Sequence, residues 1–69
     1  MSPEDISVIV AFAKGDNSLR ELAVDVFRKN MATHGPRGNK YQRFMAEANN
    51  PAPDLALRAR YRAEVLSDD

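Results

Sequence analysis

Apolar residues recur every three or four positions through most of the chain, which is the spacing of one face of an α-helix. Four stretches show this pattern, and we expect helices over residues 3–14, 18–32, 40–49 and 52–66, with the first two forming an antiparallel pair. The run from Val8 to Val10 would also suit a buried strand, but no partner strand is present. The sequence therefore predicts a single all-α domain over residues 1–69.

Capping residues mark the ends of the first two expected helices. Ser2 and Pro3 form a helix start, with Ser2 as the N-cap and Pro3 at the first helical position. Gly15 follows the last apolar residue of that helix, where a glycine is the favoured C-terminal residue. Ser18 and Glu21 have the spacing of a capping box, which predicts that the second helix begins at Ser18.

The chain between the second and third helices contains residues that interrupt a helix. Pro36 and two glycines lie within residues 33–39, so we expect an exposed basic loop there. A second interruption, residues 49–53, contains Asn50 followed by Pro51. We expect Asn50 to cap the last helix, with Pro51 in its first turn.

The second helix has the clearest core-facing side. Its expected core residues share one stripe: Leu19, Leu22, Ala23, Val26, Phe27 and Met31. The first helix is apolar around more than half of its circumference, and it should therefore pack against two neighbours. The core-facing strip of the last helix is thin. It consists of one stripe of Leu55, Ala59, Arg62 and Leu66 and an adjoining one of Leu57, Tyr61 and Val65.

The chain has 69 residues and no cysteine. A domain this short buries about 60% of its unfolded surface, so its stability should be marginal without additional support. Disulfides are excluded, and we therefore expect a homodimer or a bound partner to supply that support. An acidic N-terminus and the lack of a long apolar run predict a cytoplasmic protein without a membrane segment.

Charge is balanced overall but unevenly distributed. Ten basic residues match ten acidic ones, yet residues 1–27 are net acidic and residues 28–62 are net basic. A compact fold would then be electrically two-sided, which favours a partner that is attracted electrostatically. Ordinary solvated helix faces explain the same distribution equally well.

No constellation of residues indicates catalysis or metal binding. His34 is the sole histidine and lies in the expected loop, without the partners that a nucleophile or a zinc site requires. Residues 35–40 superficially resemble a phosphate-binding loop but lack its Gly-Lys-Ser/Thr ending and a preceding strand. Two pairs of adjacent acids, at residues 4–5 and 68–69, read as a helix-dipole partner and a solvated tail. We expect no enzyme activity, no metal and no cofactor.

Basic residues interleaved with aromatic residues make binding the better-supported function, because arginine and tyrosine often dominate interface energies. The candidate partner-binding residues are Arg37, Lys40, Tyr41, Arg43, Arg58, Tyr61 and Arg62. Tyr41 with Arg43, and Arg58 with Arg62, are expected to be exposed anchors. The alternative is that the aromatic rings belong to the core and that the arginine stems cover its edge.

Three functional classes remain open. A helix-turn-helix DNA-binding regulator has the basic segment in its favour, since neutralising phosphates needs clustered Lys and Arg. Against it, the net charge is zero and the expected second helix begins with Leu19, Arg20 and Glu21 rather than with base-reading residues. A structural subunit is the third class. A protein-binding modulator requires no more than a stable scaffold and an anchor-rich face, and is preferred.

The chain also shows a resemblance to a known family, carried by its length, its lack of cysteine and tryptophan, and three segments. These are residues 1–5 (Met-Ser-Pro-Glu-Asp), 38–43 (Gly-Asn-Lys-Tyr-Gln-Arg) and 54–62 (Asp-Leu-Ala-Leu-Arg-Ala-Arg-Tyr-Arg). With these features the chain resembles the small quorum-sensing anti-activators of Mu-like Pseudomonas phages. The resemblance implies a helical homodimer that binds the DNA-binding domain of a LuxR-type regulator, keeps it off promoters, and also inhibits the type IV pilus assembly ATPase. It assigns no contact residue.

Overall fold

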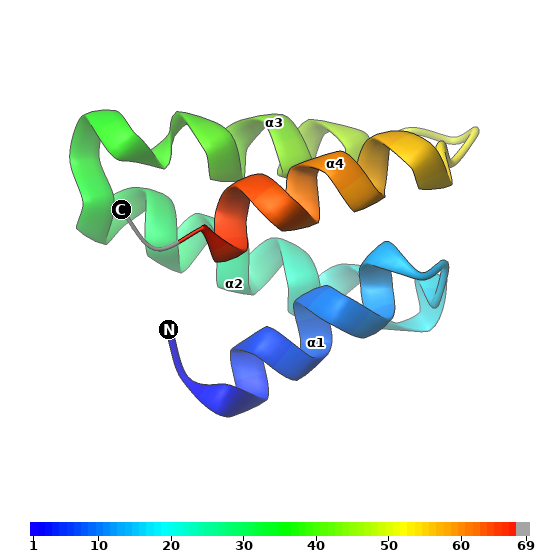
Figure 1. Cartoon of the computed structure of the whole chain (residues 1–69), viewed down its shortest axis with the longest axis horizontal. Helices are drawn as coiled ribbons and strands as arrows, with labels where there is room; N and C mark the ends of the chain where they lie inside the picture. The colour runs from blue at the N-terminus through cyan, green and yellow to red at the C-terminus, as the bar shows by residue number, and fades with distance from the viewer. Residues whose placement is uncertain (68–69) are drawn as a thin grey trace.

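A computed structural model describes residues 1–67, without the side chains of Pro36 and Arg37. Within this range the chain forms four α-helices and two short 3₁₀ turns, and no strand (Figure 1). The elements are α1 (Pro3–Ala13), η1 (Asn17–Leu19), α2 (Arg20–His34), η2 (Gly35–Gly38), α3 (Asn39–Ala48) and α4 (Leu55–Leu66). The all-α fold predicted from the apolar spacing is confirmed.

The helices alternate in direction along the long axis of the molecule, as the colour gradient in Figure 1 shows. Helix α1 packs against α2 and α4, and α3 packs against the same two helices from the other side. The described residues thus form a closed four-helix bundle measuring 28 × 21 × 18 Å. The expected antiparallel pairing of the first two helices is confirmed, as is the expectation that the first helix has two neighbours.

Aromatic rings form the centre of the core, and Phe44 of α3 contacts a ring from each of the other helices. Its centroid lies 4.5 Å from that of Phe27 on α2, in a stacked arrangement. The centroids of Phe12 on α1 and Tyr61 on α4 each lie 5.9 Å from that of Phe44. Aromatic pairs at these separations add stability beyond the area they bury, so Phe44 connects all four helices.

The predicted boundaries of α1 are largely correct, whereas the predicted start of α2 is wrong. Ser2 caps α1 by accepting a hydrogen bond from the Asp5 backbone N–H at 3.2 Å, and Gly15 ends it with a φ of 111°, where a β-carbon would be strained. Ser18 does not cap α2. The Asp16 carboxylate instead accepts from the Ser18 backbone N–H, and this interaction stabilises the η1 turn ahead of the helix.

Residues 33–39 are helical rather than the expected loop, although Thr33, His34, Gly35 and Asn39 are exposed as predicted. Helix α2 continues to His34, and Gly35, with a φ of 56°, then redirects the chain into the single turn η2. Gly38 is buried, and a β-carbon on it would lie 3.0 Å from the Met31 Cα. The expectation failed because Gly38 allows η2 to approach the backbone of α2 closely, while Gly35 provides the positive φ that redirects the chain.

The last helix begins three residues later than predicted, and Asn50 is not its N-cap. Asn50 accepts a hydrogen bond from the Ala52 backbone N–H at 2.9 Å, while the Asp54 carboxylate accepts from the Leu57 N–H at 3.1 Å and caps α4. The reason is local. A residue before proline is disfavoured in helical conformation, and Ala52 precedes Pro53.

One residue of the predicted core stripe on α2 is wrong. Leu22 is 54% exposed, whereas Ala23, Val26 and Phe27 are buried. The buried side of α2 is centred on Ala23 and also includes Asn30, whose amide donates to the Val26 carbonyl at 2.7 Å. Leu22 lies about 100° around the helix from Ala23 and points away from the bundle.

Candidate interaction surfaces

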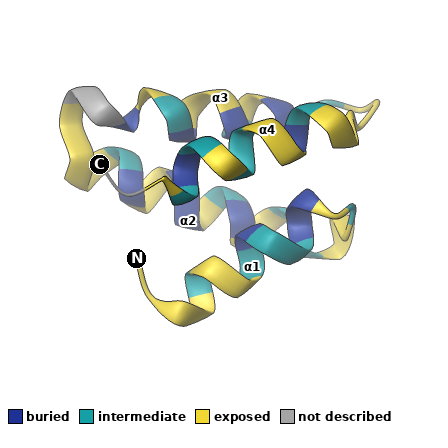
Figure 2. Ribbon diagram, in the orientation of Figure 1, coloured by how far each residue is buried: buried dark blue, intermediate teal, exposed yellow. Residues whose placement is uncertain are grey.

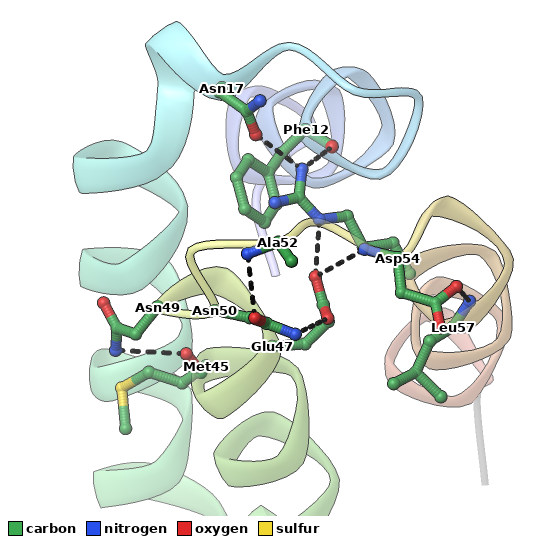
Figure 3. A network of polar contacts seen from close by, with 10 residues as sticks. Phe12, Asn17, Met45, Glu47, Asn49, Asn50, Ala52, Asp54 and Leu57 are labelled. Atoms are coloured by element: carbon green, nitrogen blue, oxygen red, sulfur yellow. Dashed lines mark hydrogen bonds and ion pairs between the residues drawn. The ribbon is translucent and has the colours of Figure 1, made fainter.

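A buried ion pair lies between the C-terminal end of α3 and the first turns of α4 (Figure 3). The Arg58 Nε donates to the Glu47 carboxylate at 2.9 Å, and both side chains are almost fully buried. The Arg58 Nη1 also donates to the Phe12 carbonyl at 3.2 Å and to the Asn17 side-chain oxygen at 2.8 Å. One guanidinium therefore joins α4 to α3, to the end of α1 and to η1.

Nearly all polar atoms of this ion pair have a partner. The Arg58 guanidinium lies 4.1 Å from the centroid of the Phe12 ring, in a cation–π arrangement, and its Nη2 has no hydrogen-bond partner among the described residues. The Glu47 carboxylate also accepts from the Asn50 side-chain amide at 3.2 Å and from the Asp54 backbone N–H at 3.4 Å. The chain entering α4 is thus held by the same carboxylate that pairs with Arg58.

Two of the four expected anchors are not exposed, which corrects that part of the sequence-based hypothesis. Arg58 is fully buried and Tyr41 is 3% exposed. Burial also raises the pKa of the Tyr41 hydroxyl above its ordinary value. Tyr61 is half-buried against Phe44. These three side chains contribute to the fold, because the aromatic rings fill the bundle and the guanidinium finds a carboxylate inside it.

Two other candidate cations, Lys40 and Arg43, lie on the outer edge between α3 and α4, and Arg60 lies next to it. Arg43 pairs with Glu64 across the two helices at 3.1 Å, and Arg60 lies 3.9 Å from the same carboxylate. Lys40 donates to the Ser67 carbonyl at 3.4 Å and lies 5.5 Å from the Tyr41 ring. This edge is basic, but its exposed cations already have partners within the chain.

The opposite edge, between α1 and α4, carries apolar side chains on its outer side. The contact between Arg43 and Glu64 shows that the Glu64 side of α4 faces α3, which leaves the stripe containing Leu55 and Ala59 on the α1 side. Leu55 is 50% exposed and its side chain lies beside Gly15, at the end of α1.

Helix α1 contributes a matching stripe to this edge. Asp5 pairs with Lys29 of α2, so the side of α1 that carries Ile6 and Val10 is turned away from α2 and towards α4. Figure 2 shows exposed and partly exposed residues along α1 and α4, the two helices nearest the viewer. We define the α1–α4 face by two sets of residues. Helix α1 contributes Ile6 and Val10, together with its C-cap residue Lys14, and α4 contributes Leu55, Ala59, Arg62 and Leu66.

The structure therefore separates the predicted site residues. Lys40 and Arg43 come together on the α3–α4 edge, Arg58 lies in the core, and Arg62 lies on the α1–α4 face. The side chain of Arg37 and the tail residues 68–69 lie outside the described part. Sequence reasoning assigned no binding role to Ile6, Val10 or Leu55. The stripe of Leu55, Ala59, Arg62 and Leu66 was the available signal, but it was assigned to the core.

The fold and these surfaces define a class of protein: a small four-helix bundle domain with one apolar outer face. No family model, curated protein or solved structure matches the chain. None of the described helices combines the length and the apolar character needed to cross a bilayer. Over the same residues, no group of three or more His, Cys, Asp or Glu side chains is placed to bind a metal ion.

The two ion pairs that join α3 to α4, Arg58–Glu47 and Arg43–Glu64, should differ sharply in their effect on stability. Removing the buried carboxylate in Glu47→Ala leaves Arg58 buried without a counter-charge, and we expect a loss of about 3–5 kcal/mol in the free energy of unfolding. Arg43→Ala removes an exposed pair and should cost less than about 1 kcal/mol. Urea unfolding followed by circular dichroism measures both. Equal losses in the two variants would contradict the structural role assigned to Arg58.

The ion pair between α1 and α2 predicts a pH dependence. A hydrogen bond from Lys29, 2.9 Å long, lowers the pKa of the Asp5 carboxyl below its ordinary value of 3.8. The unfolded chain therefore binds more protons than the folded one as the pH falls through 3.8 towards the folded pKa. Stability contributed by Asp5 is present above that window and is lost within it.

The variant Asp5→Asn should accordingly lose stability less steeply than the wild type when unfolding is measured between about pH 5 and about pH 2. Glu4→Gln is the matched control, because Glu4 is the adjacent, exposed acid. In Glu4→Gln the free energy of unfolding should fall with pH nearly as steeply as in the wild type. An unchanged slope in Asp5→Asn would show that the ion pair contributes nothing to folding.

Proposed function

We propose that the protein is a non-enzymatic binding module that inhibits another protein by covering one of its working surfaces. The observation that carries the proposal is the apolar outer side of the α1–α4 face, where Leu55, Ile6 and Ala59 remain exposed after the four helices have packed. Contiguous exposed apolar side chains on a small domain are typical of protein interaction sites. Inhibition by occlusion requires a rigid scaffold and such a face, and no reactive group.

The target in this proposal is a transcriptional regulator of the host, a LuxR-type quorum-sensing activator, whose DNA binding the protein blocks. The type IV pilus assembly ATPase is a second target of the same kind, and the cytoplasm is the site of action. Support for these identities comes from the resemblance to phage anti-activators. The fold is compatible with them, since that resemblance also implies a small helical protein.

The alternative of direct DNA binding is less well supported by the arrangement of charges. Arg58 is buried, and Arg43 and Arg60 both pair with Glu64. Phosphate neutralisation requires several cations free to replace counterions. The cations of the α3–α4 edge would have to give up their internal partners first.

The test uses a gel shift of a LuxR-type activator on its promoter DNA. Addition of the wild-type protein should release the activator from its DNA. The Leu55→Asp variant should weaken this inhibition at least about tenfold, because a charge replaces an apolar contact worth at least about 1.4 kcal/mol. Ala46→Asp is the matched control, because Ala46 is an exposed apolar residue that lies on α3, away from the α1–α4 face and from Leu22. Equal inhibition by all three proteins would contradict the proposal. Steeply salt-dependent binding to random duplex DNA, without inhibition, would favour the DNA-binding alternative.

We also propose that the chain is a homodimer. Ten buried apolar residues form its core, which is small for a domain without disulfide or metal support. Helix α1 packs against both α2 and α4 and buries Ile9 and Phe12 there, so its most apolar side does not supply the dimer contact, although Ile6 stays exposed. Leu22 supplies a candidate contact: it is 54% exposed on α2, and an exposed apolar side chain can meet its own copy across a two-fold axis.

Sedimentation equilibrium at tens of micromolar should therefore give a dimer mass, and the thermal midpoint should rise with protein concentration. Leu22→Asp should shift the equilibrium to monomer by placing like charges opposite each other. Leu55→Asp should leave it unchanged. A monomer mass for the wild type, with a midpoint independent of concentration, would refute the dimer.

A further inference from the structure

The α1–α4 face has a regular pattern of apolar and basic positions. Along α1, Ile6, Val10 and Lys14 follow one another at four-residue intervals. Along α4, Leu55 and Ala59 are followed one turn later by Arg62. Because the two helices run in opposite directions and Leu55 lies next to Gly15, Lys14 flanks the Leu55 end of the face and Arg62 lies towards the Ile6 end.

Most of the apolar part of this face is not used by the core, the exception being Leu66, which packs against it. Val10 is half-buried but does not pack against the core cluster, in contrast to Val8 of the same helix. Leu55 and Ile6 are 50% and 38% exposed, so both present apolar surface to the solvent. Their exposure costs stability, and a partner that covered them would recover that free energy.

The two cations of the face have no counter-charge within the described residues. Neither the Lys14 ammonium nor the Arg62 guanidinium forms an ion pair or hydrogen bond there, and Arg62 is nevertheless half-buried. Other arginines of the bundle, such as Arg43 and Arg58, do have carboxylate partners. No acidic residue belongs to the two stripes. The face is therefore apolar along its length and positive at two places.

This combination discriminates between occupants. A second copy of the same face would bring Lys14 and Arg62 against identical cations, with no carboxylate on either side to neutralise them. Nucleic acid would place phosphates on the two cations. Its charged backbone offers no apolar surface to cover the exposed leucine and isoleucine. An amphipathic helix that carries acidic residues beside its apolar stripe satisfies both requirements, and a site between two helices suits a third helix.

We propose that the α1–α4 face binds an acidic amphipathic helix of the inhibited protein, with apolar side chains over Val10, Leu55 and Ala59 and carboxylates on Arg62 and Lys14. The inference rests on the proposed inhibitory function and assigns the chemistry of its partner. It places Arg62 as the residue that selects the sign of the partner's charge, while the apolar stripe supplies affinity.

The experiment measures the fluorescence anisotropy of three helical peptides that share one leucine and alanine stripe. Their flanking positions are all Glu, all Gln or all Lys. The wild-type protein should bind the Glu peptide at least about tenfold more tightly than the Lys peptide, with the Gln peptide between them. Arg62→Glu should reverse that order. Binding that is absent, or equal for all three peptides, would overturn the proposal.

Arg60→Glu is the matched control, because Arg60 lies on the same helix two residues away and next to Glu64, towards the α3 side. It should retain the wild-type order, whereas a reversal as large as that of Arg62→Glu would show a response to net charge alone and overturn the assignment. Comparison with the promoter gel shift separates the two proposals. If inhibition of the activator needs Leu55 but is insensitive to Arg62→Glu, the proposed function stands and the acidic helix is refuted. If it is insensitive to both, both are refuted.

Discussion

The guanidinium of Arg58 is the group on which the arrangement of the bundle depends. It reaches from α4 into the interior and contacts the Glu47 carboxylate, the Phe12 carbonyl and the Asn17 side chain, which belong to three other elements. Removing a charge from water costs several kcal/mol, so such a group is stable inside only when its partners are correctly placed. Helix α4 can therefore occupy this position only when α1, η1 and α3 are in theirs.

The same interaction fixes the rotation of α4 about its own axis. The apolar residues of α4 do not define one side, since Leu55, Leu57, Tyr61 and Val65 are spread around much of the helix. With Arg58 turned inward, Val65 is buried, and Leu55 is left on the outer side. The apolar α1–α4 face is thus a consequence of the buried ion pair. A change at Glu47 would disturb the interaction face as well as the fold.

Sequence patterns predicted α1 well because its signals are local. A serine cap, a proline in the first turn and a glycine after the last turn each act through the backbone within four residues, and the structure retains all three. The predicted start of α4 failed although its signals were also local. Two prolines lie there, and either could stand in the first turn of the helix. The residue before the second proline is disfavoured in helical conformation, so the helix begins only after Asp54. The predicted loop failed for a different reason, because Gly38 packs against the backbone of Met31 on the preceding helix, where a β-carbon would be too close.

The sequence alone predicts the helical class, the number of helices, and an α1 that pairs with α2 and needs a second neighbour, because these follow from apolar periodicity and from short-range capping. It could not determine which arginines are available to a partner. Arg58 and Arg62 are one turn apart on the same helix and have the same chemistry. Only the tertiary structure brings a carboxylate from α3 to Arg58 and leaves Arg62 half-buried without a carboxylate partner among the described residues. Arg58 can be buried because Glu47, eleven residues earlier in the chain, supplies a counter-charge. Local sequence patterns do not show that these two residues meet.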